Sequence, residues 1–300
     1  MLGAEGLDVS VVGLGTNNFG GRIDYDRSLA VVDEAIEQGI TLFDTADIYT
    51  QGASEDFIGR ALEGRRDAVF VATKFGKPMD ENPTEQRGSR DYIRWAVEGS
   101  LKRLRTDYID LYQMHEPDPG TPLEETLGAL DELVREGKVR FIGSSNYSAE
   151  QIDQADALAR ERGWARFVSA QNHYSLVERD IEDDVLPKCE QLGIGQLPYF
   201  PLASGLLTGK YTRGEEATEG RLAGREIPEE RWNRLEALQR YADERNVPLL
   251  HVAIGGLLGI SDAVSCVIAG ATKPEQVRSN VEAGSWQPSA DDVSALRALR

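Results

Sequence analysis

The sequence predicts an α/β protein of the (β/α)8 class, a TIM barrel formed by a single domain over residues 1–300. Three observations support this prediction. Short apolar segments alternate with amphipathic ones along the whole chain, as expected for parallel strands covered by helices. The length of 300 residues suits one such barrel. Eight apolar segments can be counted, which favours a closed barrel over an open doubly wound sheet.

The predicted strands are rich in Val, Ile and Phe and lack the apolar–polar alternation of a sheet with one face in water. Strands buried on both faces have this composition. They are residues 9–14, 40–43, 69–73, 109–114, 139–143, 167–170, 194–200 and 263–268, the seventh being interrupted by Gln196.

Helices are predicted between these strands from apolar spacing and end signals. Leu29, Val32 and Ile36 share one helical face, and Gly39 is placed as a stop. A similar apolar stripe follows Ser89. These patterns predict helices that pack one face on the sheet.

Two further helix starts carry capping signals. Residues 121–124 resemble a capping box with Pro122 at the first helical position. Ser148 and Gln151 form a second capping box, whose helix ends at Gly163.

Later in the chain, two adjacent glycines at 255 and 256 predict a softened helix, because helical Gly costs about 1 kcal/mol relative to Ala. Residues 290–300 are expected to form a final helix.

Composition excludes several classes of protein. The formal net charge of −18 argues against binding nucleic acid, which needs Lys and Arg to neutralise phosphates, and against an anionic membrane surface. The two cysteines, Cys189 and Cys266, lie far apart and suggest neither a disulfide framework nor a zinc site. No signal peptide or membrane-spanning segment is recognisable, so the expected location is the cytoplasm.

Candidate catalytic residues lie where a barrel places them, at the carboxyl ends of the strands. Asp44 ends the second predicted strand, with Tyr49 in the loop that follows; Lys74 ends the third and His115 the fourth. Each residue alone has an ordinary structural explanation. Their convergence on one rim of one barrel is what indicates function.

These four residue types suit proton transfer to a carbonyl. Tyrosine is a weak acid with an unperturbed pKa of about 10, and a nearby ammonium group lowers that pKa. A carboxylate paired with Lys74 would hold the ammonium in place, and Tyr49 could then donate a proton to the carbonyl oxygen. A neutral His115 could donate a second hydrogen bond to the developing oxyanion.

Several segments resemble the successive signatures of the aldo-keto reductase family. They occur in the family's order and cover nearly the whole chain: VSVVGLGTNNFGG, FDTADIY, ATKFG, DLYQMHEPD, GKVRFIGSSNYSAEQI, QNHYSLVERD, YFPLASGLLTGKY and VIAGATKPEQVRSNVEA. The resemblance implies that Tyr49 is the general acid in reduction and the general base in oxidation, tuned by Lys74 and Asp44, and that His115 polarises the carbonyl. It implies direct hydride transfer without a metal.

The cofactor implied by the resemblance is NADP(H). A Rossmann fingerprint is absent, because Asn18 occupies the last glycine position of the motif that begins at Gly13. In the family the cofactor lies extended across the barrel mouth. The implied contacts are Ser144, Asn146 and Gln171 at the carboxamide, Tyr199 stacked on the nicotinamide, and Pro201, Leu202, Ala203, Ser204 and Lys210 along the pyrophosphate, with Arg221 less securely aligned. Gly15, Thr16, Asn17 and Asp44 complete that part of the set.

The adenosine end of the cofactor is assigned to the segment before the last long helix. The resemblance implies Gly270, Thr272 and Lys273 near the 2′-phosphate, with Arg278 one turn on, and Gln276 and Asn280 near the adenine ribose and base. A helix N-terminus binds anions through its free N–H groups. Cations here favour NADPH over NADH.

The substrate is least determined by the sequence. An aromatic pocket formed by Asn17, Phe19, Tyr49, Phe75 and His115 suits small aldehydes, ketones or sugar-derived carbonyls. His173 is expected either to contact the ligands or to pack. Two other functions stay open: an NADP(H)-binding redox sensor or channel-associated subunit with little turnover, and a metal-dependent barrel isomerase, which the lack of a carboxylate and His cluster disfavours. The oligomeric state is not predictable.

Overall fold

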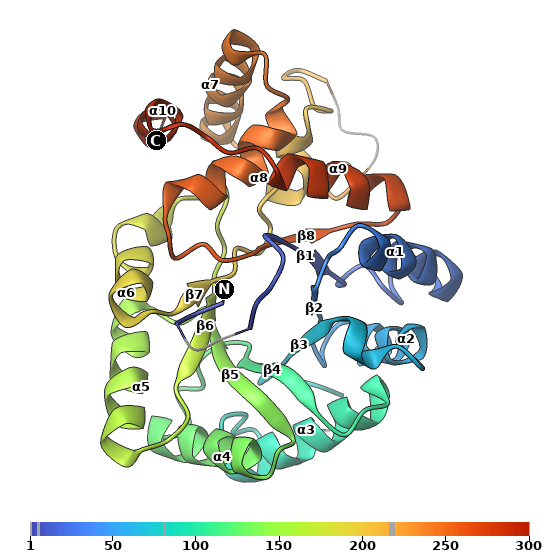
Figure 1. Cartoon of the computed structure of the whole chain (residues 1–300), viewed down its shortest axis with the longest axis vertical. Coiled ribbons are helices and arrows are strands. Elements are labelled where there is room, and N and C mark those ends of the chain that lie inside the picture. Colours follow the sequence, from blue (N-terminus) through green and yellow to red (C-terminus); the bar gives the residue numbers. More distant parts are fainter. Residues whose placement is uncertain (1, 5–6, 81, 216–219, 300) are drawn as a thin grey trace.

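The computed structural model describes residues 2–4, 7–80, 82–215 and 220–299, which fold as a (β/α)8 barrel (Figure 1). Each strand is short and mostly buried. The strands are β1 (Val12–Gly15), β2 (Leu42–Asp44), β3 (Phe70–Phe75), β4 (Ile109–Met114), β5 (Val139–Ser145), β6 (Phe167–Gln171), β7 (Gly195–Gln196) and β8 (Val267–Gly270).

The strands form one parallel sheet in the order β7-β6-β5-β4-β3-β2-β1-β8. Its ends meet through isolated parallel bridges from Gln196 to Val264 and from Tyr199 to Ile268. Because the two edge strands contact each other in this way, the sheet closes into a ring. The predicted barrel is therefore confirmed.

Helices surround the sheet (Figure 1). Most follow a strand and cover the outside of the barrel, while α7, α8 and α10 extend it on the side of β8. They are α1 (Tyr25–Glu37), α2 (Ala53–Ala61), α3 (Arg90–Leu104), α4 (Leu123–Arg135), α5 (Ala149–Arg162), α6 (Val185–Leu192), α7 (Glu229–Arg245), α8 (Leu249–Ile260), α9 (Pro274–Gly284) and α10 (Ala290–Ala298), with the short 3-10 turns η1 (Arg66–Ala68), η2 (Asp180–Glu182) and η3 (Ala203–Thr208).

The hydrophobic core has two parts. The larger lies between the sheet and the helices. The smaller lies inside the barrel, where Leu2, Leu7 and Val9 of the N-terminal segment pack against residues of the strands. The N-terminus lies at the centre of the ring in Figure 1, so this segment fills one end of the barrel. Within the described ranges, no helix is long and apolar enough to cross a bilayer.

Strand boundaries differ from the predictions at two places: where side-chain hydroxyls form hydrogen bonds in place of the sheet ladder, and where a proline interrupts the ladder. The first strand begins at Val12 rather than at residue 9, because Ser10 and Thr41 bond through their hydroxyl groups instead of through the sheet ladder. The seventh, predicted over 194–200, contains only Gly195–Gln196. Pro198 has no N–H to donate to a ladder, and its carbonyl accepts from Ile268 N at 3.0 Å.

The capping predictions have mixed outcomes. Ser148 and Gln151 form the expected capping box, and Gly163 ends α5 in the left-handed conformation. The capping box at residues 121–124 is wrong: α4 begins after Pro122, and no side chain caps it. The Thr121 hydroxyl instead donates to the Asp118 carboxylate, at Oδ2, over 2.7 Å.

Two glycines of α8, Gly255 and Gly259, have a packing role that the sequence analysis did not predict. A Cβ at Gly255 would lie 2.5 Å from the carbonyl oxygen of Trp286, and one at Gly259 would lie 2.2 Å from Pro288. The chain that links α9 to α10 therefore packs directly on the α8 backbone. At Gly255 the contact with a backbone oxygen is one that only glycine permits, and the expected softness of the helix stays a prediction.

Candidate active site

A cavity of about 910 Å³ opens at the carboxyl ends of the strands, opposite the N-terminal segment. It is large enough for an extended organic ligand. Among the predicted site residues it is lined by Gly15, Thr16, Asn17, Asp44, Tyr49, His115, Asn146, Gln171, Tyr199, Pro201, Leu202, Ser204, Lys210, Gly270, Thr272, Lys273, Gln276 and Asn280.

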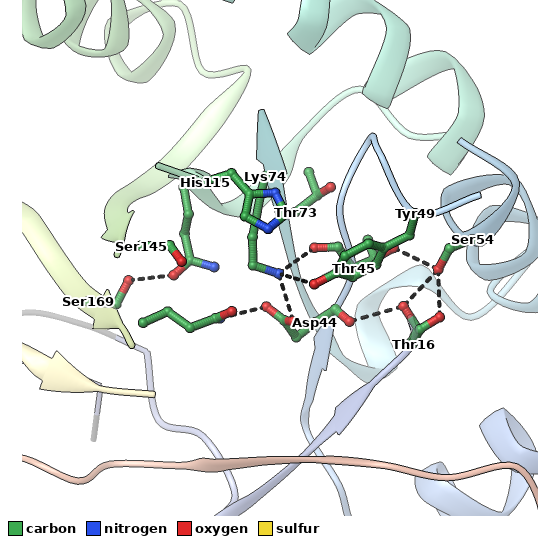
Figure 2. A network of polar contacts seen from close by, with 12 residues as sticks. Thr16, Asp44, Thr45, Tyr49, Ser54, Thr73, Lys74, His115, Ser145 and Ser169 are labelled. Atoms are coloured by element: carbon green, nitrogen blue, oxygen red, sulfur yellow. Dashed lines mark hydrogen bonds and ion pairs between the residues drawn. The ribbon is translucent and has the colours of Figure 1, made fainter. Parts of the chain in front are cut away.

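Lys74 is the centre of the polar network at the floor of this cavity (Figure 2). Its side chain is fully buried, and Nζ donates to Asp44 Oδ2 at 2.7 Å, to the Thr45 carbonyl at 2.8 Å and to the Tyr49 hydroxyl at 3.4 Å. Gln171 Nε2 donates to the other Asp44 oxygen at 2.8 Å. These hydrogen bonds thus hold the Lys74 ammonium and the Asp44 carboxylate each in one orientation.

Burial and charge act in opposite directions on this network. Burial favours neutral Lys74, but the adjacent Asp44 carboxylate and the Tyr49 hydroxyl outweigh it, so the Lys74 pKa is raised and the ammonium persists. Burial raises the pKa of Tyr49, and the Lys74 cation only partly offsets this. The net direction differs from the sequence-based expectation of a lowered Tyr49 pKa, because the burial of the phenol outweighs the ammonium.

His115 lies beside Tyr49, with ring centroids 5.9 Å apart and planes at 82°. Burial, with the charges of Lys74 and Lys77, lowers its pKa to about 2. The imidazole is therefore neutral at physiological pH and has one N–H to donate. Its backbone is fixed from both sides, since His115 N donates to the Phe75 carbonyl at 2.8 Å and Asn146 Nδ2 donates to the His115 carbonyl at 2.8 Å.

The turn that carries Tyr49 has an unusual backbone. Thr50 and Gln51 have φ of 52° and 50°, followed by Gly52 at 90°. Such left-handed conformations are costly for residues with a Cβ and persist only where the surroundings enforce them. A cluster of hydroxyls helps to do so: Ser54 Oγ lies 2.9 Å from both Thr16 Oγ1 and Thr45 Oγ1 (Figure 2).

Amide and aromatic side chains line the next part of the cavity. The Tyr199 hydroxyl donates to Asn146 Oδ1 at 2.8 Å. His173 stacks on the Tyr199 ring at 5.4 Å between centroids and 8° between planes. His173 itself is not among the cavity residues. It thus covers one face of Tyr199, which is the packing role that the sequence left open.

Two of the predicted cofactor contacts need correction. Ser144 does not line the cavity, whereas Ser145 does. Successive side chains of a strand point to opposite faces, so only one of the two serines at the end of β5 can face the barrel mouth. Ala203 is also buried away from the cavity, in the core, with φ of 46° in a tight turn.

Two aromatic residues expected in the substrate pocket also lie elsewhere. Phe19 and Phe75 are both fully buried in the main core and do not line the cavity. Phe200, which the sequence analysis did not single out, is 39% exposed and lines it instead. Its backbone has a left-handed φ of 53°, so the chain changes direction at this residue.

The segment after β7 crosses back to the start of the barrel. Arg221 donates to Asn17 Oδ1 at 2.5 Å and to Asn18 Oδ1 at 2.8 Å. Lys210 also lines the cavity, and its ammonium lies about 5.0 Å from the Tyr211 ring centroid. This segment therefore brings two cations to the cavity wall.

The start of α9 forms the far end of the cavity. Gln276 Oε1 accepts from Thr272 N at 2.7 Å, which orders the residues before the helix. Lys273 and Arg27 line the cavity here, and Arg27 donates to the Thr272 carbonyl at 3.5 Å. Arg278 does not line it, because its guanidinium is paired with Glu34 at 2.5 Å and Glu275 at 3.4 Å. The sequence-based placement of Arg278 at this end is corrected accordingly.

Comparison with known proteins identifies the family. The model of the aldo/keto reductase family matches residues 11–300. The chain belongs to the aldo/keto reductase family. It is 40% identical to "Uncharacterized oxidoreductase YrpG" and 38% identical to "Aldo-keto reductase YhdN", both of Bacillus subtilis (strain 168). These alignments cover 94% and 98% of this chain and 89% and 91% of the relatives.

A third relative has a different kind of name. The chain is 34% identical to the "Probable voltage-gated potassium channel subunit beta" of Oryza sativa subsp. japonica, over 94% of this chain and 89% of that protein. The names of the other relatives and the family itself support an oxidoreductase that acts on small molecules with a nicotinamide cofactor.

The residues of this aldo-keto reductase fit such a cofactor. The cavity is lined by amide side chains at Asn146 and Gln171 and by cationic side chains elsewhere along its wall. A carboxamide needs hydrogen-bonding partners at one end, and phosphates need cations farther along. Within the described residues, no group of three or more His, Cys, Asp or Glu side chains could hold a metal ion.

Sequence reasoning assigned no ligand contact to several cavity residues, some inside the family motifs and some outside them. They include Asn18, Arg22, Ile23, Arg27, Lys77, Ser145, Phe200, Gly205, Thr208, Gly220, Leu250, Ile268, Glu275 and Ser279. Six of them lie in loops, where a single sequence gives no periodic signal. The others lie in helices or strands, whose pattern predicts the element but not which side chains face a cavity. The one usable signal was position, since Lys77 follows closely on the end of β3.

Proposed function

We propose that the protein is an NADP(H)-dependent aldo-keto reductase that transfers hydride between nicotinamide and the carbonyl of an aldehyde, ketone or sugar. The observation that carries this proposal is the buried Lys74 ammonium, bonded to Asp44 at 2.7 Å and to the Tyr49 hydroxyl at 3.4 Å. Both partners line a cavity of about 910 Å³. An acid with a fixed cation beside it is the arrangement that carbonyl reduction needs.

Tyr49 acts as the general acid in reduction. Because burial raises its pKa, the phenol keeps its proton until a carbonyl oxygen becomes basic enough to accept it. The Lys74 ammonium stabilises the phenolate that remains, and Asp44 keeps this ammonium charged and in place. In oxidation the same residues act in reverse, with Tyr49 accepting the proton of the alcohol. When bound, the cofactor supplies or accepts the hydride.

His115 orients the carbonyl. As a neutral imidazole it donates one hydrogen bond without competing for the proton that Tyr49 transfers. Asn146 and Phe75 bond its backbone at 2.8 Å each, so the position from which the imidazole projects is set before substrate binds. Such preorganised donors lower the barrier because they need no rearrangement as charge develops.

The preference for NADP(H) over NAD(H) is supported by the end of the cavity at α9. Lys273 and Arg27 both line it, next to a helix N-terminus with Pro274 in the first turn. Two cations and free N–H groups suit a phosphate monoester. Gln276 and Asn280 line the same end and suit the adenine ribose and base.

The experiment that tests this function is NADPH oxidation by the purified protein over a panel of aldehydes and ketones, with Tyr49→Phe beside wild type. We expect the rate of Tyr49→Phe to fall at least 100-fold while its NADPH affinity stays within about threefold. Tyr108→Phe is the matched control, since that hydroxyl bonds Asp67 far from the cavity. A Tyr49→Phe variant that keeps more than a tenth of the rate would exclude Tyr49 as proton donor.

A redox-sensing subunit with little turnover is the second candidate. The relative with a channel-subunit name favours it, at 34% identity. The same assay separates the two functions. Tight NADPH binding without Tyr49-dependent turnover of any carbonyl would support the sensor and contradict the enzyme.

A further inference from the structure

The charges around the cavity are distributed unevenly. Among the described residues that line it, six carry cations and two carry carboxylates, although the whole chain has a formal net charge of −18. Of the carboxylates, Asp44 is bonded to Lys74 and Glu275 lies at the α9 end. The cationic residues are Arg22, Arg27, Lys77, Lys210, Arg221 and Lys273.

Five of these cations come from three segments that contact one another. Arg22 and Arg27 belong to the stretch after β1, Lys210 and Arg221 to the stretch after β7, and Lys273 to the start of α9. Arg221 bonds Asn17 and Asn18, and Arg27 bonds the Thr272 carbonyl. These cations line the side of the cavity that the proposed function assigns to the cofactor.

Lys77 lies on the other side. It follows β3, two strands away from β1 in the sheet, and its nearest carboxylate, Glu116, follows β4. Its charge lowers the pKa of His115, so the ammonium lies within electrostatic range of the imidazole. The position is thus next to the carbonyl site rather than along the cofactor.

The backbone beneath Lys77 is anchored. The Tyr92 hydroxyl, on a fully buried side chain, donates to the Lys77 carbonyl at 2.9 Å, and Arg87 Nε donates to the Gly76 carbonyl at 2.9 Å. The ammonium itself has only a loose partner: Nζ is 3.7 Å from Glu116 Oε2, and both side chains are about one-third exposed, at 34% and 39%. The backbone of Lys77 is therefore fixed, and its ammonium group can accommodate a second acceptor.

We propose that Lys77 binds an oxyanion group on the substrate, so that the preferred substrates are carbonyl compounds bearing a carboxylate or phosphate. The inference rests on the proposed function and adds the substrate class to it. An ammonium that gains a second acceptor in a partly desolvated cavity strengthens binding of that ligand over a neutral isostere. Glu116 competes for the same ammonium and keeps it oriented between turnovers.

The test compares matched substrate pairs by kcat/KM. One arm uses 4-carboxybenzaldehyde against its neutral methyl ester, and the other uses glyceraldehyde 3-phosphate against glyceraldehyde; the arms distinguish carboxylate from phosphate. We expect wild type to prefer the charged member at least tenfold in one arm. Lys77→Gln should reduce that preference at least fivefold, mainly through KM, and Glu116→Gln should increase it. Lys102→Gln, exposed on α3, is the matched control and should leave the ratio unchanged.

The outcomes separate this inference from the proposed function. Tyr49-dependent turnover with no preference for the charged member, or a preference that Lys77→Gln leaves intact, would overturn the inference and keep the function. Lack of turnover for every carbonyl would contradict the function. Binding of benzoate against benzamide to the NADPH complex, followed by cofactor fluorescence, then still tests Lys77: equal affinities overturn the assignment, and a benzoate preference lost in Lys77→Gln supports it.

Discussion

At the scale of single residues, two aspartates three positions apart have opposite environments. Asp44 accepts hydrogen bonds from Lys74 and Gln171. Asp47 is only 1% exposed, and neither of its side-chain oxygens has a hydrogen-bond partner of normal geometry. The cation that lowers the pKa of Asp47 most, Arg103, is bonded to the buried Glu55 at 2.7 Å. One carboxylate is therefore satisfied within the proposed site, and we expect the other to reduce stability.

Burial raises the pKa of Asp47 well above its usual value, and Glu55 adds to this effect. A carboxyl with a raised folded-state pKa binds its proton more tightly when folded, so stability falls as pH rises above the unfolded pKa of about 4. Asp47→Asn removes the titration. We expect its Tm to exceed that of wild type at pH 7.5, and the gain to shrink towards pH 4.5. A Tm difference independent of pH would show that Asp47 is ionised in the folded protein.

The arginines near α9 make a second prediction at this scale. Arg27 lines the cavity, whereas Arg278 is committed to Glu34 and Glu275. We expect Arg27→Ala or Lys273→Ala to raise the Kd for NADPH about tenfold or more, equivalent to about 1.4 kcal/mol, and the Kd for NADH much less. Arg278→Ala should change both by less than threefold. Titration by fluorescence measures these constants; a selective NADPH defect in Arg278→Ala would contradict the assignment.

At the scale of elements, close backbone contacts override helix propensity in α8. Gly255 meets the Trp286 carbonyl, so this helix fits against the chain leading to α10 only without a side chain. The sequence revealed the glycines and their low propensity but not the partner, which is 31 positions away. Sequence patterns describe neighbours on one helix, whereas this contact depends on how two segments pack.

A pair of glycine substitutions tests this account. In Gly255→Ala the new Cβ would lie 2.5 Å from a backbone oxygen that cannot move freely, so we expect a loss of about 1–3 kcal/mol in the free energy of unfolding. Gly99→Ala in α3 meets only the flexible end of Arg103, at 2.9 Å, and should be neutral or stabilising by up to about 1 kcal/mol. Urea unfolding measures both. Equal effects would mean that the Trp286 contact relaxes without cost.

At the scale of the whole molecule, the barrel and the grouping of Asp44, Tyr49, Lys74 and His115 could be predicted because both depend on strand order. Parallel strands bring their carboxyl ends to one rim, so residues after β2, β3 and β4 must meet there. The direction of the Lys77 side chain and the paired state of Arg278 could not be predicted in the same way. Those details depend on side-chain direction and on competing ion pairs, which one sequence does not specify.

Closure of the barrel leads to a prediction about ligand-linked stability. The cavity is lined by residues from Gly15 in the N-terminal part of the chain to Asn280 in the C-terminal part, so a bound dinucleotide would contact both parts of the chain at once. Ligand that binds only the folded state stabilises it by about 2.7 kcal/mol at 100-fold excess over Kd, which raises Tm by several degrees. We expect NADPH to produce this shift in wild type and in Tyr49→Phe alike, because the proposed role of that hydroxyl is proton transfer rather than cofactor binding. Arg27→Ala should show a smaller shift at the same NADPH concentration. A thermal shift no larger than that produced by ATP, which shares only the adenosine and phosphate groups, would show that the nicotinamide end of the cavity contributes little to binding.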